Sequence, residues 1–304
     1  MALPLTAVRG ERRPFKKDLQ GWTLTSPYLI FTAVFFLVPL IWSLFLVFQR
    51  WDLIAPTPVF VGLANLKEAL TSPRVLQAFL VTYKFILLFV PLVMAVSIGL
   101  AMLVHHLPRY KPLFAVGFFL PYLASGVVIS LVVRGVISYN NAFETFLRHS
   151  FGASPDWLND GTLATLLITL MMIWKFAGYY ALIFLSGLQS IPVDVYEAAS
   201  LDGANAWKQF WHITLPLLYP AFYTVLIIAV GLTFSIFTEP FVLTNGGPQM
   251  ATQTWQLEIY YQAFDLFRAG YGATVALLNA VATLISILII RSLVESWGRR
   301  NGWE

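Results

Sequence analysis

Side chains that could carry out chemistry are few in this sequence, and none of them are grouped with the spacing of a catalytic or metal site. The chain has no cysteine, which excludes disulfides, thiolate metal ligands and cysteine nucleophiles. A membrane-embedded enzyme would need clustered carboxylates or histidines in the apolar stretches, and the sequence has no such cluster. The four histidines lack ligand spacing and acidic neighbours: His105, His106, His149 and His212. We therefore expect no catalytic residue, no metal site and no cofactor bound by this chain.

One ionisable side chain lies deep in an apolar stretch. At about 1.5 Å of helical rise per residue, Lys175 is about 20 Å from the outer end of its predicted helix. An ionisable residue at that depth normally faces a wet cavity or a partner group. Lys175 therefore either binds a ligand or pairs with Glu239 or with helix carbonyls. Arg134 and Glu239 are predicted to lie nearer the outer interface, where long polar side chains extend toward water.

The chain that positions these residues is an integral membrane protein by composition. Of its 304 residues 58% are hydrophobic and 11% are charged, and the mean hydropathy is +0.73. Six apolar runs are long enough to cross a hydrocarbon core of about 30 Å; they are residues 28–48, 78–104, 113–137, 162–188, 217–238 and 269–290. Pro121 predicts a kink in the third run. We expect an all-α fold with six transmembrane helices and a lipid bilayer around it.

Basic residues indicate how these six helices are oriented. Eleven Lys and Arg residues fall in the N-terminal tail, the two inner loops and the C-terminal end, against five in the outer segments. Because basic residues concentrate on the cytoplasmic side, both termini are predicted to be cytoplasmic. The chain then divides into a basic cytoplasmic tail at 1–20 and a six-span domain at 21–304. The basic residues are scattered instead of lining one face, so nucleic acid is not expected as a partner.

This topology places one ordered polar stretch, residues 189–216, inside the cell. Its sequence, QSIPVDVYEAASLDGANAWKQFWHITLP, predicts two short helices with a bend at Gly203. Asp194 and Glu197 are expected in the first turns of the first helix, where they could cap it. Trp207 and Trp211 provide apolar surface that a solvated loop does not need, which favours docking to a partner. The alternative is an amphipathic helix on the inner leaflet, although such helices are usually basic and this one is acidic.

No nucleotide-binding loop of the G-x-x-x-x-G-K-[ST] type occurs in the chain. Any energy used must therefore come from a partner. The segment EAASLDGANAWKQFWHITLPLL, residues 197–218, resembles the EAA motif of permease subunits of ATP-binding-cassette importers, in the maltose-type carbohydrate uptake group. Similar stretches cover nearly all of the chain beyond the tail: FVGLANL at 60–66, FFLPYLASGVVISL at 118–131, WKFAGYYALIFLSGLQSIP at 174–192 and LTNGGP at 243–248.

The resemblance implies a type I importer permease fold and a set of partners in a prokaryotic inner membrane. In that family the EAA segment is the coupling helix, which sits in a cleft of an ATPase subunit that carries ATP and Mg²⁺. The residues given this coupling role are Glu197, Ala198, Ala199, Asp202, Gly203, Ile213, Leu215 and Pro216. A second six-span permease of different sequence is expected, and so is an extracytoplasmic solute-binding protein. The loop that meets the binding protein would contain Asn245, Gly246, Gly247 and Pro248.

The resemblance also places a substrate pathway in the spans before and after the motif, at Lys175, Phe176, Tyr179, Leu232, Thr233 and Ile236. Aromatic rings can stack on a sugar ring and hydroxyl groups can bond to its hydroxyls, which supports a sugar or oligosaccharide as cargo. Packing within an aromatic-rich bundle is the alternative for these residues. Arg134 and Lys175 motivate a second cargo, glycerol 3-phosphate or another acidic solute. A self-contained secondary carrier and a membrane-embedded enzyme are the rivals from other classes.

Overall fold

A computed structural model describes residues 15–137, 142–152 and 155–302. Apart from one short hairpin, the described elements are helices. Four of these helices are long and apolar enough to cross a membrane alone, and two pairs of bent helices bring the number to as many as six. All six predicted apolar runs fall on these helices or pairs. The all-α prediction is therefore confirmed, and the number of spans is between four and six.

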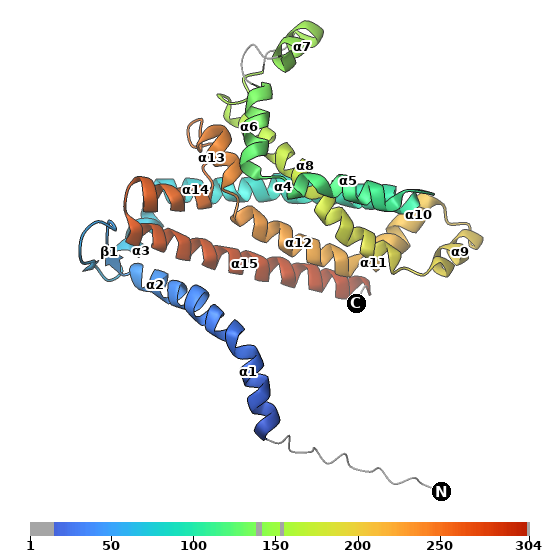
Figure 1. Cartoon of the computed structure of the whole chain (residues 1–304). Helices are drawn as coiled ribbons and strands as arrows, with labels where there is room; N and C mark the ends of the chain where they lie inside the picture. Colours follow the sequence, from blue (N-terminus) through green and yellow to red (C-terminus); the bar gives the residue numbers. More distant parts are fainter. Residues whose placement is uncertain (1–14, 138–141, 153–154, 303–304) are drawn as a thin grey trace.

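The first apolar run forms α1 (Phe15–Thr32) and α2 (Val38–Leu46), joined by a π-helical turn, η1 (Ala33–Leu37). Helix α1 begins inside the segment predicted as a basic tail, and residues 1–14 of that tail lie outside the described residues. In Figure 1 the blue helix α1 points away from the other helices, whereas α2 approaches α15. Nearly all side chains from Gly21 to Leu46 are exposed in the isolated chain, so this span is available to lipid or to another subunit.

A compact corner follows the first span. Strand β1 (Gln49–Arg50) pairs antiparallel with β2 (Val59–Phe60), and α3 (Ala64–Thr71) comes next. The buried Asn65 amide donates to the carbonyls of Val47 and Gln49, at 2.9 and 2.8 Å. The backbone of Gly270 lies so close to the Gln49 carbonyl that a Cβ there would overlap it. Asn65 thus attaches the hairpin to α3, and Gly270 packs it against the start of α15 (Ala269–Asn301).

The core is built on α4 (Pro73–His106) and α8 (Gly161–Gln189), which run in the same direction. Their outer ends are joined by a bond from the Lys84 ammonium to the Thr165 hydroxyl, at 2.9 Å. Between them the side chains of Phe85, Phe89 and Phe184 are completely buried. Helices α12 (Tyr219–Phe234) and α15 pack beside this pair (Figure 1). In a bilayer, whose lipid tails are as apolar as these side chains, close packing and hydrogen bonds between helices therefore hold the bundle together.

The third apolar run differs from its prediction. Instead of one helix kinked at Pro121, it forms α5 (Lys111–Leu123) and α6 (Gly126–Ile137), at 88° to each other. Pro121 lies inside the last turns of α5, and the chain breaks where Ala124 becomes extended. Helix α5 lies along α8, whereas α6 turns away to contact α13 (Thr238–Thr244) (Figure 1). Beyond α6 comes α7 (Ala142–Phe151).

The fifth and sixth runs also have limits that the sequence misjudged. The helical stretch Ala206–Leu217 meets α12 at a 68° bend, and α12 ends at Phe234, before the predicted end at 238. Helices α13 and α14 (Trp255–Tyr260) and a π-turn, η3 (Tyr261–Asp265), then form a small lobe on the side that the sequence predicts to be external, called the outer lobe below. The sixth helix, α15, continues to Asn301, well past the predicted end at 290.

Candidate functional site

The coupling segment, defined as residues 189–216, contains the predicted pair of short helices. Its first helix is α9 (Val193–Leu201), and its second part comprises α10 (Ala206–Gln209), a π-turn, η2 (Phe210–Thr214), and the start of α11 (Leu215–Leu217). Gly203 has φ +78°, a left-handed conformation that only glycine adopts readily. The bend predicted at Gly203 is confirmed.

Polar contacts fix the angle between the two halves of the coupling segment. The Gln209 amide donates to the Ser200 hydroxyl at 2.9 Å and to the Ala204 carbonyl at 3.1 Å. The Tyr196 and Thr214 hydroxyls are 3.0 Å apart and share a hydrogen bond. Asn205 caps α10 by accepting from the Lys208 backbone N–H. The segment is thus a preformed unit and not a pliable loop.

Apolar side chains are exposed along this unit. Leu201 is 90% exposed, Trp207 68% and Val193 66%. Of the predicted coupling residues, Glu197, Ala198, Asp202 and Gly203 are exposed, whereas Ala199, Ile213, Leu215 and Pro216 are partly buried. Several large exposed apolar side chains on one short segment are typical of an interaction site.

One expectation for the coupling segment is wrong. The residue that caps α9 is Pro192, and no side chain accepts a hydrogen bond from the start of the helix. Asp194 lies in the first turn and complements the helix dipole, but Glu197 lies beyond that turn. The acidic side chains of α9 are therefore free for another partner.

Lys175 and Glu239 form an ion pair inside the bundle. The Lys175 ammonium lies 3.1 Å from Glu239 Oε1, and the two side chains are only 13% and 8% exposed. Gly126 packs against the pair, because a Cβ at this position would lie 2.9 Å from the ammonium and 3.1 Å from the carboxylate. The pair joins the middle of α8 to α13, beside the break between α5 and α6. Of the alternatives that the sequence left open for Lys175, the structure therefore shows the pairing with Glu239.

The sequence suggested that Glu239 extends toward the outer interface. Instead, its carboxylate is buried in the protein and paired with the Lys175 ammonium. Arg134 is exposed, and its guanidinium donates to the Val242 carbonyl at 3.2 Å. Among the described residues, no three His, Asp or Glu side chains are placed to hold a metal ion.

An aromatic cluster surrounds Tyr179. The rings of Tyr179 and Tyr122 are stacked, with centroids 4.5 Å apart and an angle of 11° between their planes. Phe119 lies beside both rings, and Phe176 meets Tyr122 edge-on at 5.8 Å. Tyr122 and Phe119 come from α5, and sequence reasoning did not select them. Their signals were the neighbouring Pro121 and the stretch FFLPYLASGVVISL, residues 118–131, which carries part of the resemblance.

Helix α5 can approach α8 this closely because of Gly178. A Cβ at this position would overlap the Phe118 backbone carbonyl. The small residue thus sets the distance between the two helices that carry the aromatic cluster. Backbone contact at a glycine is a common way for membrane helices to pack.

The pathway residues after the motif are more buried than those on α8. Thr233 is completely buried, and its hydroxyl donates to the Ala229 carbonyl of its own helix at 2.8 Å. Ile236 is 4% exposed, and its carbonyl accepts from the Thr254 hydroxyl at 2.8 Å. Leu232 is partly buried against the core. In this conformation Thr233 and Ile236 pack, whereas Phe176 and Tyr179 keep part of their surface open.

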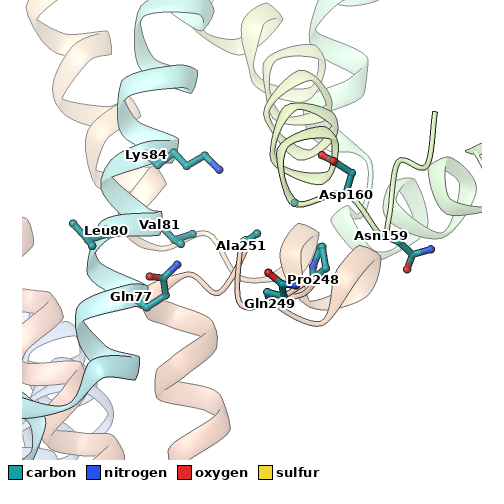
Figure 2. A pocket seen from close by; sticks show the side chains of 10 residues that line it. Gln77, Leu80, Val81, Lys84, Asn159, Asp160, Pro248, Gln249 and Ala251 are labelled. Atoms are coloured by element: carbon teal, nitrogen blue, oxygen red, sulfur yellow. The ribbon is translucent and has the colours of Figure 1, made fainter.

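The predicted binding-protein loop lies in the outer lobe. Asn245 and Gly246 both have positive φ, at +48° and +81°. Pro248 borders a pocket of about 540 Å³ between the loop and the outer ends of α4 and α8. Figure 2 shows Gln77 and Lys84 from α4, Asn159 and Asp160 before α8, and Pro248, Gln249 and Ala251 from the loop around this pocket.

Solved structures have the same fold. The chain superimposes on a chain of a bacterial ABC transporter involved in the import of the acidic polysaccharide alginate, with a TM-score of 0.79. The sequence identity is 21%, and the match covers 94% of this chain and 96% of the other. A second structure shows a bacterial alginate transporter in complex with an alginate pentasaccharide-bound periplasmic protein, and its matching chain has a TM-score of 0.78 and 21% identity over 90% of this chain and 93% of the other.

Sequence relatives are closer. The arabinooligosaccharides transport system permease protein AraP of Bacillus subtilis (strain 168) is 33% identical over 296 residues, covering 93% of this chain and 91% of that protein. The sn-glycerol-3-phosphate transport system permease protein UgpA of Agrobacterium fabrum (strain C58 / ATCC 33970) is 30% identical over 279 residues, covering 91% and 92%. Residues 19–300 match the family described as "Binding-protein-dependent transport system inner membrane component". The chain therefore belongs to this family, as a multi-pass permease subunit of a binding-protein-dependent transporter.

Proposed function

We propose that this chain is one of two six-span permeases of an ATP-driven importer in a prokaryotic inner membrane, with both termini in the cytoplasm. The observation that carries the proposal is the preformed coupling segment with its exposed apolar surface. It needs a partner to cover Leu201 and Trp207, and no nucleotide-binding motif occurs in this chain. An ATPase subunit that carries ATP and Mg²⁺ fits both requirements.

The coupling segment is well placed to transmit movement. It follows directly on α8 and leads directly into α12, so it links two helices of the core. Closure of two ATPase subunits would draw this segment toward its counterpart on a second permease of different sequence. The cavity between the permeases would then open outward to receive cargo from an external binding protein. This chain itself performs no catalysis.

A sugar or oligosaccharide is the cargo that the site supports best. The partly open rings of Tyr179, Tyr122 and Phe176 offer the flat apolar surface on which sugar rings stack. The similarity to AraP, whose name states transport of arabinooligosaccharides, points to the same class.

Glycerol 3-phosphate or another acidic solute is the second candidate. The similarity to UgpA supports it, as does the exposed guanidinium of Arg134. Lys175 supports it less than the sequence suggested, because Glu239 already neutralises its charge.

Uptake by reconstituted vesicles tests the proposal. The chain should be co-purified with the ATPase, second permease and binding protein encoded by neighbouring genes. We expect uptake of labelled oligosaccharide only with ATP and binding protein. Uptake that persists without the ATPase would refute the importer and favour a secondary carrier. Uptake of glycerol 3-phosphate with no affinity of the binding protein for any saccharide would exchange the first cargo for the second.

Variants of Tyr179 test the pathway. Tyr179→Ala removes the stacking ring, so we expect cargo-stimulated transport to fall more than basal ATP hydrolysis. Tyr179→Phe keeps the ring and serves as the matched control. Equal loss of transport and of basal hydrolysis in Tyr179→Ala would show that the ring only packs.

A further inference from the structure

A buried carboxylate lies at the centre of the outer lobe, 13 residues after Asn245 in the chain. Glu258 of α14 has no exposed surface. Its oxygens accept four hydrogen bonds: from Arg74 at 3.2 and 3.1 Å, from the Gln253 amide at 2.8 Å and from the Gln262 amide at 2.6 Å. Arg74 lies in the first turn of α4 and also stacks over the Tyr261 ring. A carboxylate so completely satisfied fixes the side chains that bind it.

One of these side chains connects the carboxylate to the surface loop. Gln253 is 5% exposed and directs its amide nitrogen to Glu258. Its amide oxygen lies against the backbone of Gly246, where a Cβ would overlap it. Gln262 binds the same carboxylate from η3, and within the described part of the chain its amide oxygen has no hydrogen-bond partner. Both glutamines thus bind the Glu258 carboxylate, but only Gln253 also contacts the backbone of Gly246.

The loop that Gln253 touches begins with two left-handed residues. Asn245 and Gly246 have φ +48° and +81°, and Asn245 is the residue at which α13 ends. The Thr252 hydroxyl supports the loop by donating to the Gly247 carbonyl at 2.8 Å. Between the loop and Arg74 lies a pocket of about 210 Å³ that Asn245, Gly246 and Gly247 line. A small shift of the loop would change the shape of this pocket.

We infer that Glu258 and Gln253 are positioning residues for docking of the binding protein. Glu258 fixes Gln253, and Gln253 holds loop 244–248 in the shape that receives a side chain of the partner. The inference rests on the proposed function, because it assigns the loop to a binding protein. The Arg74–Glu258 pair ties the loop to α4, so the docking surface moves as one body with the core.

Two matched substitutions test this inference. Gln253→Leu and Gln262→Leu each remove one hydrogen bond from a side-chain amide to Glu258. Only Gln253→Leu also removes the contact with Gly246. The complete transporter in nanodiscs should be measured for affinity toward the binding protein and for hydrogen exchange at residues 244–252. We expect Gln253→Leu to weaken binding at least tenfold and to speed exchange. Gln262→Leu should stay within twofold of the unmodified transporter in both measurements.

Gln253→Asn provides a second variant if Gln253→Leu does not assemble. It keeps the amide but is one carbon shorter, so it cannot reach Glu258 and Gly246 together, and the same tenfold loss is expected. Equal effects of Gln253→Leu and Gln262→Leu, in affinity and in exchange, would overturn the positioning role. If the unmodified transporter binds no binding protein, the proposed function fails. The exchange measurement still decides whether Gln253 holds the loop.

Discussion

Replacing Lys175 by methionine should destabilise the protein strongly, because it leaves the Glu239 carboxylate without its counter-ion. The two groups are 3.1 Å apart, and their side chains are 13% and 8% exposed, so water replaces little of the lost interaction. Removing one member of such a buried pair typically costs about 3–5 kcal/mol. We expect a cost in this range for Lys175→Met and a similar one for Glu239→Leu.

The double variant separates pairing from cargo binding. Replacing a whole buried ion pair by apolar residues of similar size is often neutral or stabilising, by about 1–4 kcal/mol. Lys175→Met/Glu239→Leu should therefore regain most of the stability lost in each single variant. The interaction energy from the four proteins should be at least about 3 kcal/mol, since neighbouring residues depart from additivity.

Thermal unfolding of the purified transporter gives the stabilities, and vesicle uptake gives the function. If Lys175 serves only to pair, uptake should return with stability in the double variant. A double variant that is stable but does not transport would show that one of these side chains contacts cargo. Single variants as stable as the unmodified chain would refute the argument from burial.

Substitutions at three further positions follow from a close contact, a backbone conformation and a buried hydrogen bond. Gly178→Ala places a methyl group onto the Phe118 carbonyl, so it should separate α5 from α8 and cost about 1–3 kcal/mol of stability in thermal unfolding. Gly203→Val should cost about 1–3 kcal/mol of stability, because φ is +78° at this position. It should impair ATP-driven uptake without loss of membrane insertion. Gly203→Asn should retain uptake, since asparagine tolerates this conformation. Asn65→Ala leaves the buried Gln49 carbonyl without its amide donor and should cost about 1–3 kcal/mol of stability. Asn65→Asp should be more damaging, because a carboxylate oxygen would face the carbonyl. Normal unfolding temperatures for both variants would contradict this account.

Features that depend on neighbours in the chain could be predicted from the sequence. The apolar runs gave the positions of the helices, because spanning a membrane requires an uninterrupted apolar stretch. The bend at Gly203 was predictable because glycine adopts a left-handed conformation more readily than any other residue. The coupling segment stood out as ordered polar sequence between two apolar runs.

Features that depend on contacts across the fold could not be predicted in this way. The right-angled break after α5 occurs where Gly126 meets the Lys175–Glu239 pair, and no local pattern announces that meeting. The stacking of Tyr122 on Tyr179 requires the approach of α5 to α8 at Gly178. Arg74 and Glu258 are separated by 184 positions, so only the folded chain brings them together.

The two ends of the coupling segment are connected to the core in different ways, and this difference bears on how it could act. Helix α8 runs unbroken for 29 residues into the segment and carries Lys175 near its middle. On the other side the segment contains a π-turn, η2, and a 68° bend at Leu218 separates it from α12. A continuous helix transmits displacement along its axis, whereas a bend between helices absorbs part of it as a change of angle. Movement of the coupling segment should therefore shift Lys175 relative to Glu239. We expect this ion pair to be among the first contacts in the membrane-spanning part to change.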